Sequence, residues 1–265
     1  MPDSPVQLAI TEWQNKQITG TELMRRLVSF DKWMLPVSEA AAAEMVSTGA
    51  ASRLMYSQDG EGVSRLYLFS DGEAYDAFRE AVSQEASEQH FLTTTGTWIF
   101  QLPLDQLDAI EIDPATSWQI SYRKEQFPRL RAMAGAVEVE QALTALRAGT
   151  AEPGSITKVR HYEHYILAVT SLNGGYTLAL APDDRDRTLA AIFTSDDSFE
   201  AFLPEGEALV SEGQLLRVAL AGPKLFEQLS RMSLDGVVFN CSGPGRPIAF
   251  TQAFLTVILE AKPGE

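Results

Sequence analysis

The chain has 265 residues, of which 45% are hydrophobic, a composition typical of a globular protein with room for two domains of ordinary size. Acidic residues outnumber basic residues by 36 to 21, so the net charge is −15 and the surface repels phosphate groups. This charge argues against non-specific binding to nucleic acid or to anionic membranes, and it favours a basic protein partner or solubility alone.

The amino terminus lacks the basic region and the apolar core of a signal peptide, and no run approaches the roughly 18 apolar residues of a membrane span. Cys241 is the single cysteine, so no disulfide can form within the chain. We therefore expect a cytoplasmic protein without a cofactor, present as a monomer or a weak homodimer.

In the first half of the chain, amphipathic spacing predicts a helix over residues 6–14, and a capping box at Thr19 and Glu22 predicts a second helix. Pro103 predicts the start of a short helix. Residues 40–45 predict a helical turn, and residues 59–62 predict a hairpin. Apolar runs predict strands at residues 34–37, 53–57, 64–69, 98–102, 110–112 and 118–120.

A locally basic joint at about residues 121–137 is followed by a predicted helix over residues 138–148. Asn173-Gly174 predicts a hairpin, and Gly222-Pro223 predicts the start of a helix. A last helix is expected from Thr251 to residue 259. The strands predicted in this half span residues 165–170, 176–180, 188–193, 215–220, 237–239 and 248–250.

Two segments of the chain match closely. Residues 69–78 (FSDGEAYDAF) correspond to residues 193–202 (FTSDDSFEAF), and in each a strand is followed by a Ser or Thr, an acid three residues later and an aromatic helix. We interpret Ser70 and Thr194 as helix caps, because a hydroxyl can accept an early backbone N–H. Tyr75 and Phe78 would then share the buried face of their helix.

Two further pairs of segments match at similar spacing, roughly 124 to 132 residues, which suits a duplicated small domain. Residues 108–113 correspond to 235–240, and residues 33–37 correspond to 165–169. We predict an α+β fold, with mostly antiparallel or mixed sheets and flanking helices. The first repeat would span residues 1–125 and the second residues 126–265.

The duplicated unit resembles the bacterial SseB family. The resemblance rests on residues 69–78 and 193–202, and on the strand at residues 235–240 (DGVVFN), which precedes a Gly-rich turn and a short apolar strand. The family pattern has Asn-Pro at the end of this strand, whereas this chain has Asp113-Pro114 in one copy and Asn240-Cys241 in the other. The resemblance implies a bacterial intracellular protein, a link to secretion or toxin loci, and no reaction.

Four residues form a candidate interaction or ligand corner: Asp113, Asn240, Cys241 and Arg246. Asp113 and Asn240 follow equivalent strands, where Asx side chains initiate turns by bonding to their own backbone; a paired ligand site is the alternative. Cys241 precedes a Gly-rich turn but lacks an assignable base that would activate a thiol. Arg246 closes Gly243-Pro244-Gly245, a tight turn in which Pro244 removes an N–H that a phosphate cradle would need.

His161 and His164 have a spacing that could place two metal ligands on one helix. The sequence offers no third ligand nearby, and the segment runs directly into a predicted strand, so we predict no metal site and no catalytic residue. His90 lies in a polar stretch and is expected to be exposed.

We expect a non-enzymatic module that binds another protein. An immunity protein or a chaperone for a basic toxin or secreted effector is a sharper form of this hypothesis, because an acidic surface captures basic partners quickly. The alternative is a small-ligand-binding protein or an enzyme that uses the cleft between the two repeats, with Cys241, His161 and His164 as its candidate residues.

Overall fold

The computed structural model describes residues 4–37, 57–58, 62–82, 90–172, 175–181, 187–209, 214–242 and 247–261. The chain forms two compact units, unit 1 (Met1–Val137) and unit 2 (Glu138–Glu265). This division lies at the end of the predicted joint and within helix α6 (Phe127–Ala148), so most of the joint is helical. The predicted boundary between the two repeats, at residues 125 and 126, stays a prediction.

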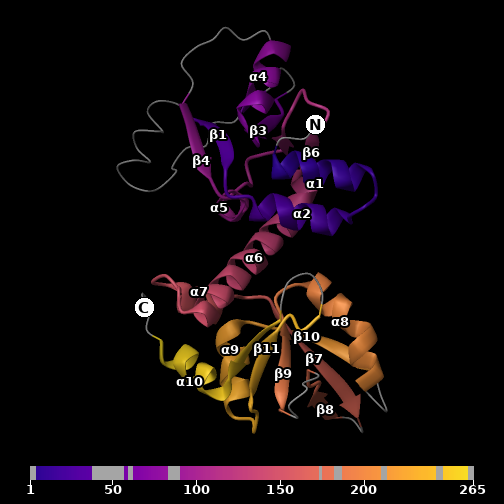
Figure 1. Ribbon diagram of the computed structural model, residues 1–265, viewed down its shortest axis with the longest axis vertical. Coiled ribbons are helices and arrows are strands. Elements are labelled where there is room, and N and C mark those ends of the chain that lie inside the picture. The colour runs from indigo at the N-terminus through magenta and orange to yellow at the C-terminus, as the bar shows by residue number, and fades with distance from the viewer. Residues whose placement is uncertain are drawn as a thin grey trace. The chain divides into compact units, whose positions relative to one another are not determined.

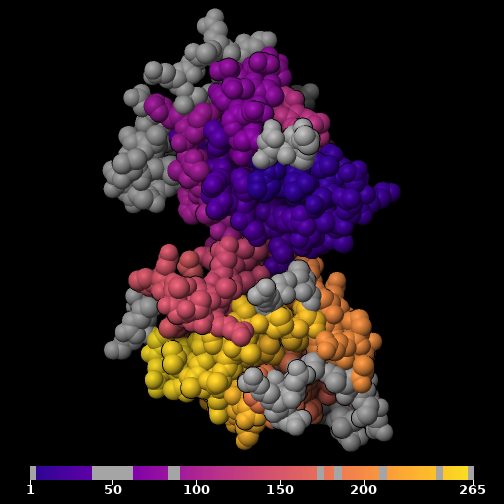
Figure 2. All heavy atoms as spheres, viewed as in Figure 1, coloured from indigo at the N-terminus to yellow at the C-terminus, as the bar shows by residue number. Residues whose placement is uncertain are grey.

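Unit 1 begins with two helices that pack together (Figure 1), and the indigo atoms of this part of the chain lie together in Figure 2. Each is capped by a hydroxyl, Ser4 for the first helix and Thr19 for the second, which confirms the predicted cap at Thr19. Among the described residues, the helices confined to this unit are α1 (Pro5–Gln14), α2 (Gly20–Ser29), α4 (Gly72–Ala81), α5 (Gly96–Gln101) and the 3-10 turn η1 (Lys124–Gln126).

The strands of unit 1 form a mixed arrangement. β3 and β5 pair in parallel, β2 flanks β3 and β6 flanks β5, while β1 and β4 form an antiparallel pair that a bridge from Met34 to Phe69 links to the rest. The strands are β1 (Trp33–Val37), β2 (Ser57–Gln58), β3 (Ser64–Leu68), β4 (His90–Thr94), β5 (Ala109–Ile112) and β6 (Ile120–Arg123).

Unit 2 has one sheet with the strand order β10-β7-β9-β11-β12, and β8 pairs with part of β7. Its central pair, β9 and β11, is parallel, and its flanking pairs are antiparallel. The strands are β7 (Tyr165–Leu172), β8 (Gly175–Leu178), β9 (Leu189–Phe193), β10 (Leu215–Leu220), β11 (Gly236–Phe239) and β12 (Ile248–Thr251).

Helices cover both faces of this sheet: α8 and α9 lie on opposite sides of the strands (Figure 1). One core cluster contains Phe226 and Leu229 of α9, and another contains Phe199 and Phe202 of α8. The helices confined to this unit are α7 (Ser155–His161), α8 (Asp196–Leu209), α9 (Gly222–Ser230) and α10 (Gln252–Glu260). Together with unit 1, these elements confirm the α+β fold class.

Both units use the same local contacts to attach a helix to the sheet. The indole of Trp33 donates to the carbonyl of Leu27 at 3.0 Å, and the hydroxyl of Tyr165 donates to the carbonyl of Val159 at 2.8 Å. Gly96 and Gly222 each begin a helix so close to another backbone segment that a Cβ would lie 2.5 Å and 2.1 Å from a carbonyl oxygen, respectively. Only glycine fits such positions.

Several local predictions were wrong. Residues 98–102 are mostly helix α5, because Thr95 accepts the N–H of Trp98 and starts a helix where the apolar run had predicted a strand. Pro103 starts no helix, and Trp118 lies in a turn before β6. The helix over residues 155–161 was not predicted. The predicted turn at residues 40–45 lies outside the described residues.

The aromatic helices confirm the predicted packing but not the predicted caps. Tyr75 and Phe78 both contact Phe69, as Phe199 and Phe202 both contact Phe193. The caps are one residue later than predicted: Asp71 accepts the N–H of Ala74, and Ser195 accepts the N–H of Ser198. Ser70 and Thr194 are thereby free for other contacts.

No helix in the described part of the chain is long and apolar enough to cross a membrane.

Candidate functional site

Asp113 is fully buried at the end of β5, where it holds the start of α4 in place. Its carboxylate accepts the backbone N–H of Ser70 at 2.7 Å and the Ser70 hydroxyl at 2.6 Å. Its φ of 44° lies in the left-handed region, which Asp and Asn tolerate better than most residues. Its side chain therefore bonds across the sheet, and not to its own backbone as a turn-initiating Asx would.

The environment of Asp113 disfavours a charge. Burial raises the pKa of Asp113 from 3.8 to about 6, although the two hydrogen bonds from Ser70 favour the ionised form and partly oppose this rise. No basic side chain in the described part of the chain bonds to it; a neutral hydroxyl and a backbone amide hold the carboxylate. The corner in unit 1 is thus a buried acid that titrates close to neutral pH.

The hydrogen-bond chain continues from Asp113 to the surface of unit 1. The Ser4 hydroxyl donates to the Ser70 hydroxyl at 3.0 Å, and the Gln7 amide donates to Asp71 at 2.7 Å. Through these contacts the start of α1 is fixed to the start of α4. Ser4, Ser70 and Asp71 all lie in the wall of a surface groove.

This groove is an open cavity of about 770 Å³. Its apolar lining comes from the first turn of α1 and the end of α2: Pro5, Val6, Leu8 and Phe30. Leu8 is 47% exposed although it is a large apolar residue. An apolar lining with a few polar groups is typical of a binding site.

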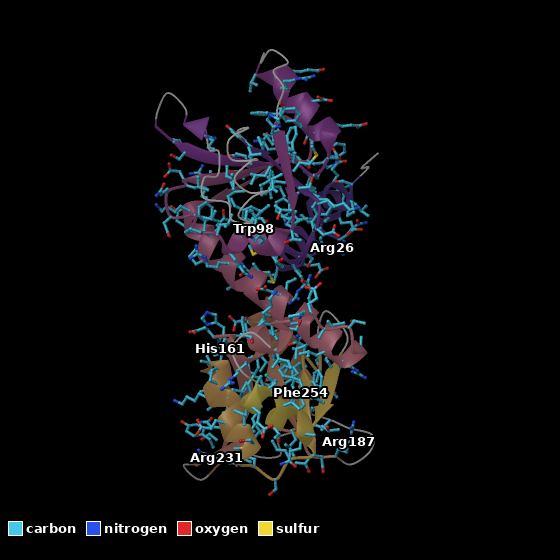
Figure 3. The ribbon with its side chains drawn as sticks, turned by 90° about the vertical axis from the view of Figure 1, so that its left-hand side faces the viewer. Arg26, Trp98, His161, Arg187, Arg231 and Phe254 are labelled. Atoms are coloured by element: carbon cyan, nitrogen blue, oxygen red, sulfur yellow. The ribbon has the colours of Figure 1, made fainter. Side chains whose placement is uncertain are left out.

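Charged side chains surround the apolar lining: Asp31, Asp71 and Glu73 are acidic, and Arg26 and Lys32 are basic. The charge of Arg26 is matched by ion pairs to Glu12 and Glu22, with nitrogen to oxygen distances of 2.5 Å and 2.9 Å (Figure 3 labels Arg26). The three acids therefore outweigh Lys32, and the rim of the groove is negative.

Asn240 occupies the matching corner of unit 2, at the end of β11, with a φ of 50°. Its side-chain oxygen accepts the backbone N–H of Thr194 at 3.0 Å, and its amide donates to Glu140 at 3.0 Å and to the Thr194 hydroxyl at 2.9 Å. The Thr194 hydroxyl also lies 2.6 Å from Glu140. Here the single negative charge sits on Glu140 of α6, and the corner residue itself is neutral.

Cys241 is half-buried and packs against the core cluster on the α8 side of the sheet. The pKa of the Cys241 thiol is raised to about 11, mainly by burial and to a lesser extent by the nearby charge of Glu205. The thiol is therefore protonated at neutral pH, the opposite of what a nucleophile needs. Arg246, the fourth member of the predicted corner, lies outside the described residues.

His161 is the last residue of α7, and its side chain projects away from the ribbon (Figure 3). His164 is also exposed, and its ring contacts Tyr162. Within the described part of the chain no group of three His, Cys, Asp or Glu side chains could hold a metal ion. His90 is exposed, as predicted.

Sequence reasoning missed the partners of the two corner residues. Ser70 and Thr194 occupy matching positions, and both bond to the residue that ends the neighbouring parallel strand. A signal for this contact is present in the sequence. In both matched regions a Ser or Thr follows one strand and an Asp or Asn follows the later strand that pairs with it. The sequence alone favours a cap for each hydroxyl, because a helix follows each of them directly.

No model of a known protein family matches the sequence, and no curated protein matches it either. Among solved structures, Anabaena Tic22 (protein transport) is similar at 10% sequence identity and a TM-score of 0.22, with 93% of this chain and 100% of that chain covered.

Proposed function

We propose that this chain is a non-enzymatic protein-interaction module, and that the groove of unit 1 binds an apolar and basic segment of a partner protein. The observation that carries the proposal is the combination of an apolar lining at Leu8 and Phe30 with a rim on which acids predominate. An apolar anchor on the partner would cover the exposed Leu8, and flanking basic residues would face Asp31 and Glu73.

The net charge of −15 supports the same kind of partner. It accelerates the encounter with a basic protein and makes the capture sensitive to salt. A chaperone or immunity protein for a basic toxin or secreted effector is the sharper form of the proposal. Toxin or secretion genes beside this gene would support that form, and their absence would remove it.

The proposal also includes a duplication of SseB-like units in a bacterial cytoplasmic protein. It is supported by the matched corners, Asp113 with Ser70 and Asn240 with Thr194, and by a parallel strand pair with antiparallel flanks in each unit. The corners hold secondary structure together by buried bonds. They therefore belong to the scaffold, and we assign binding in unit 1 to the groove.

Co-purification from the native cell tests the proposal with a matched pair of variants. Leu8→Lys introduces a charge into the groove, whereas Val82→Lys changes an equally exposed residue at the end of α4, since the two side chains are 47% and 49% exposed. We expect one basic protein to be recovered with the wild type and Val82→Lys, and lost with Leu8→Lys. Equal recovery with all three proteins would refute the groove as the binding site.

A further inference from the structure

β10 forms an open edge of the unit 2 sheet. It pairs with β7, and within the described part of the chain no strand lies on its other side. It is six residues long, LLRVAL, with neither proline nor glycine. Edge strands in monomers are usually short, covered, or protected by proline, a charged side chain or a bulge, because an open edge pairs readily with another strand. The one charge on β10 is Arg217, and an ion pair to Asp196 at 2.6 Å holds its side chain toward α8.

The backbone groups that face this open edge can be assigned from the neighbouring ladder. Ala168 of β7 lies opposite Arg217, and its carbonyl accepts the N–H of Ala179 at 2.9 Å on the side of β7 away from β10. In an antiparallel pair the N–H and C=O of a residue point to the same side, and bonded pairs alternate with non-bonded pairs. Leu215, Arg217 and Ala219 therefore direct their N–H and C=O groups outward.

The side chains of β10 favour one pairing with an identical strand. An antiparallel partner centred on Val218 would place Val218 opposite Val218 and Leu216 opposite Leu220, so that half-buried apolar side chains meet on one face. On the other face, Arg217 would lie opposite the small, exposed Ala219. A centre on Arg217 would instead place Arg217 opposite Arg217, a destabilising like-charge pair.

We propose that β10 is a homodimerisation edge, which pairs antiparallel with β10 of a second copy through the register centred on Val218. This register is self-complementary, as a two-fold interface requires. Arg217 and Ala219 exchange N–H and C=O bonds across the axis, and Leu216 and Leu220 extend the apolar face. Each chain carries a net charge of −15, so the dimer is weak at low salt and is strengthened when salt screens the repulsion.

Sedimentation velocity of the full chain, over a concentration series at low and high salt, tests the interface. Ala219→Pro removes an outward N–H and leaves the ladder to β7 intact, so we expect it to abolish dimerisation. Thr93→Pro is the matched control on β4. Met34 lies opposite Thr93, and its N–H and C=O both bond to Phe69, on the side of β1 away from β4. The N–H of Thr93 therefore points outward, and Thr93→Pro should dimerise like the wild type.

Two charge variants test the register itself and do not depend on how the proline is tolerated. Ala219→Asp would lie opposite Arg217 of the second copy at two symmetric positions, and we expect the dimer Kd to fall by about 3- to 10-fold. Ala219→Arg would create two repulsive pairs and raise the Kd by a similar factor. A strictly monomeric wild type at high salt and concentration, or two variants that change the Kd in the same direction, would overturn the proposal.

Discussion

Asp113→Asn gives the corner in unit 1 the side chain that Asn240 provides in unit 2. The amide oxygen would accept the N–H of Ser70, as Asn240 accepts that of Thr194 at 3.0 Å, and the amide nitrogen would donate to the Ser70 hydroxyl. Ser70 could then donate to Ser4, which lies 3.0 Å away. The geometry is therefore retained, and the buried ionisable group is lost.

The expected effect is a change in how stability depends on pH. The pKa of Asp113 is about 6 in the folded protein, against an ordinary 3.8. Because the folded pKa is the higher one, its contribution is fully present below pH 4 and is lost as the pH rises through 6. A rise of about two pKa units corresponds to ~3 kcal/mol. We therefore expect Asp113→Asn to gain ~3 kcal/mol relative to the wild type between pH 4 and pH 7.

Tryptophan fluorescence during urea unfolding reports on the relevant unit. All four tryptophans, Trp13, Trp33, Trp98 and Trp118, lie in unit 1. The quantity to compare is the difference in the free energy of unfolding between variant and wild type at each pH, because the other carboxylates then cancel. A difference that stays constant from pH 4 to pH 7 would refute the account of Asp113 as a buried acid with a raised pKa.

The reverse exchange, Asn240→Asp, should behave in the opposite way. It would place a carboxylate where the Asn240 amide donates to Glu140 at 3.0 Å. Two like charges at this separation repel by about 5 to 6 kcal/mol near a protein surface. We expect a loss of similar size at pH 7, measured by circular dichroism, and a smaller loss at acid pH, where one carboxyl is protonated. Equal destabilisation at both pH values would point to lost packing instead.

Three further outcomes are expected. Ala115→Gly should raise the free energy of unfolding by ~1 kcal/mol in urea titrations, because Ala115 is exposed and has a φ of 64°, where a Cβ is strained; no gain would contradict the left-handed geometry. Gly222→Ala should lower it by at least ~2 kcal/mol, since the new Cβ would lie 2.1 Å from the carbonyl oxygen of Arg160; a neutral effect would contradict that close approach. Cys241, with a pKa of about 11, should react with iodoacetamide at pH 8 roughly 100-fold more slowly than an ordinary thiol, and rapid labelling would show an activated cysteine.

The sequence predicted the fold class because periodicity and turns are local signals. The helix at Thr19 follows from nearby residues alone. The hairpin predicted at residues 173–174 lies outside the described residues, but β7 and β8, which flank it, do pair antiparallel. The strand predicted near Trp98 was wrong because the prediction used only the local apolar content. The cap at Thr95 and the close approach of Gly96 to the end of α2 stabilise a helix there.

The groove could not be predicted, because it depends on contacts distant in the chain. Leu8 and Phe30 come from two helices, and Ser70, Asp71 and Glu73 come from the start of a third. Their meeting rests on the bond from Ser4 to Ser70, which joins positions 66 residues apart. The place of Asp113 after a predicted strand marks it in the sequence, but nothing there marks its partner, since a cap at Ser70 explains the local sequence equally well.

Isothermal titration calorimetry with two synthetic peptides tests the proposed binding groove most directly. The probes are a short peptide of alternating leucine and arginine and its leucine–glutamate counterpart, titrated into the wild type, Leu8→Lys and Val82→Lys. We predict salt-sensitive binding of the arginine peptide to the wild type and Val82→Lys, and a Kd at least ~10-fold higher with Leu8→Lys. Equal binding of both peptides, or equal binding to all three proteins, would contradict recognition of an apolar and basic segment by this groove.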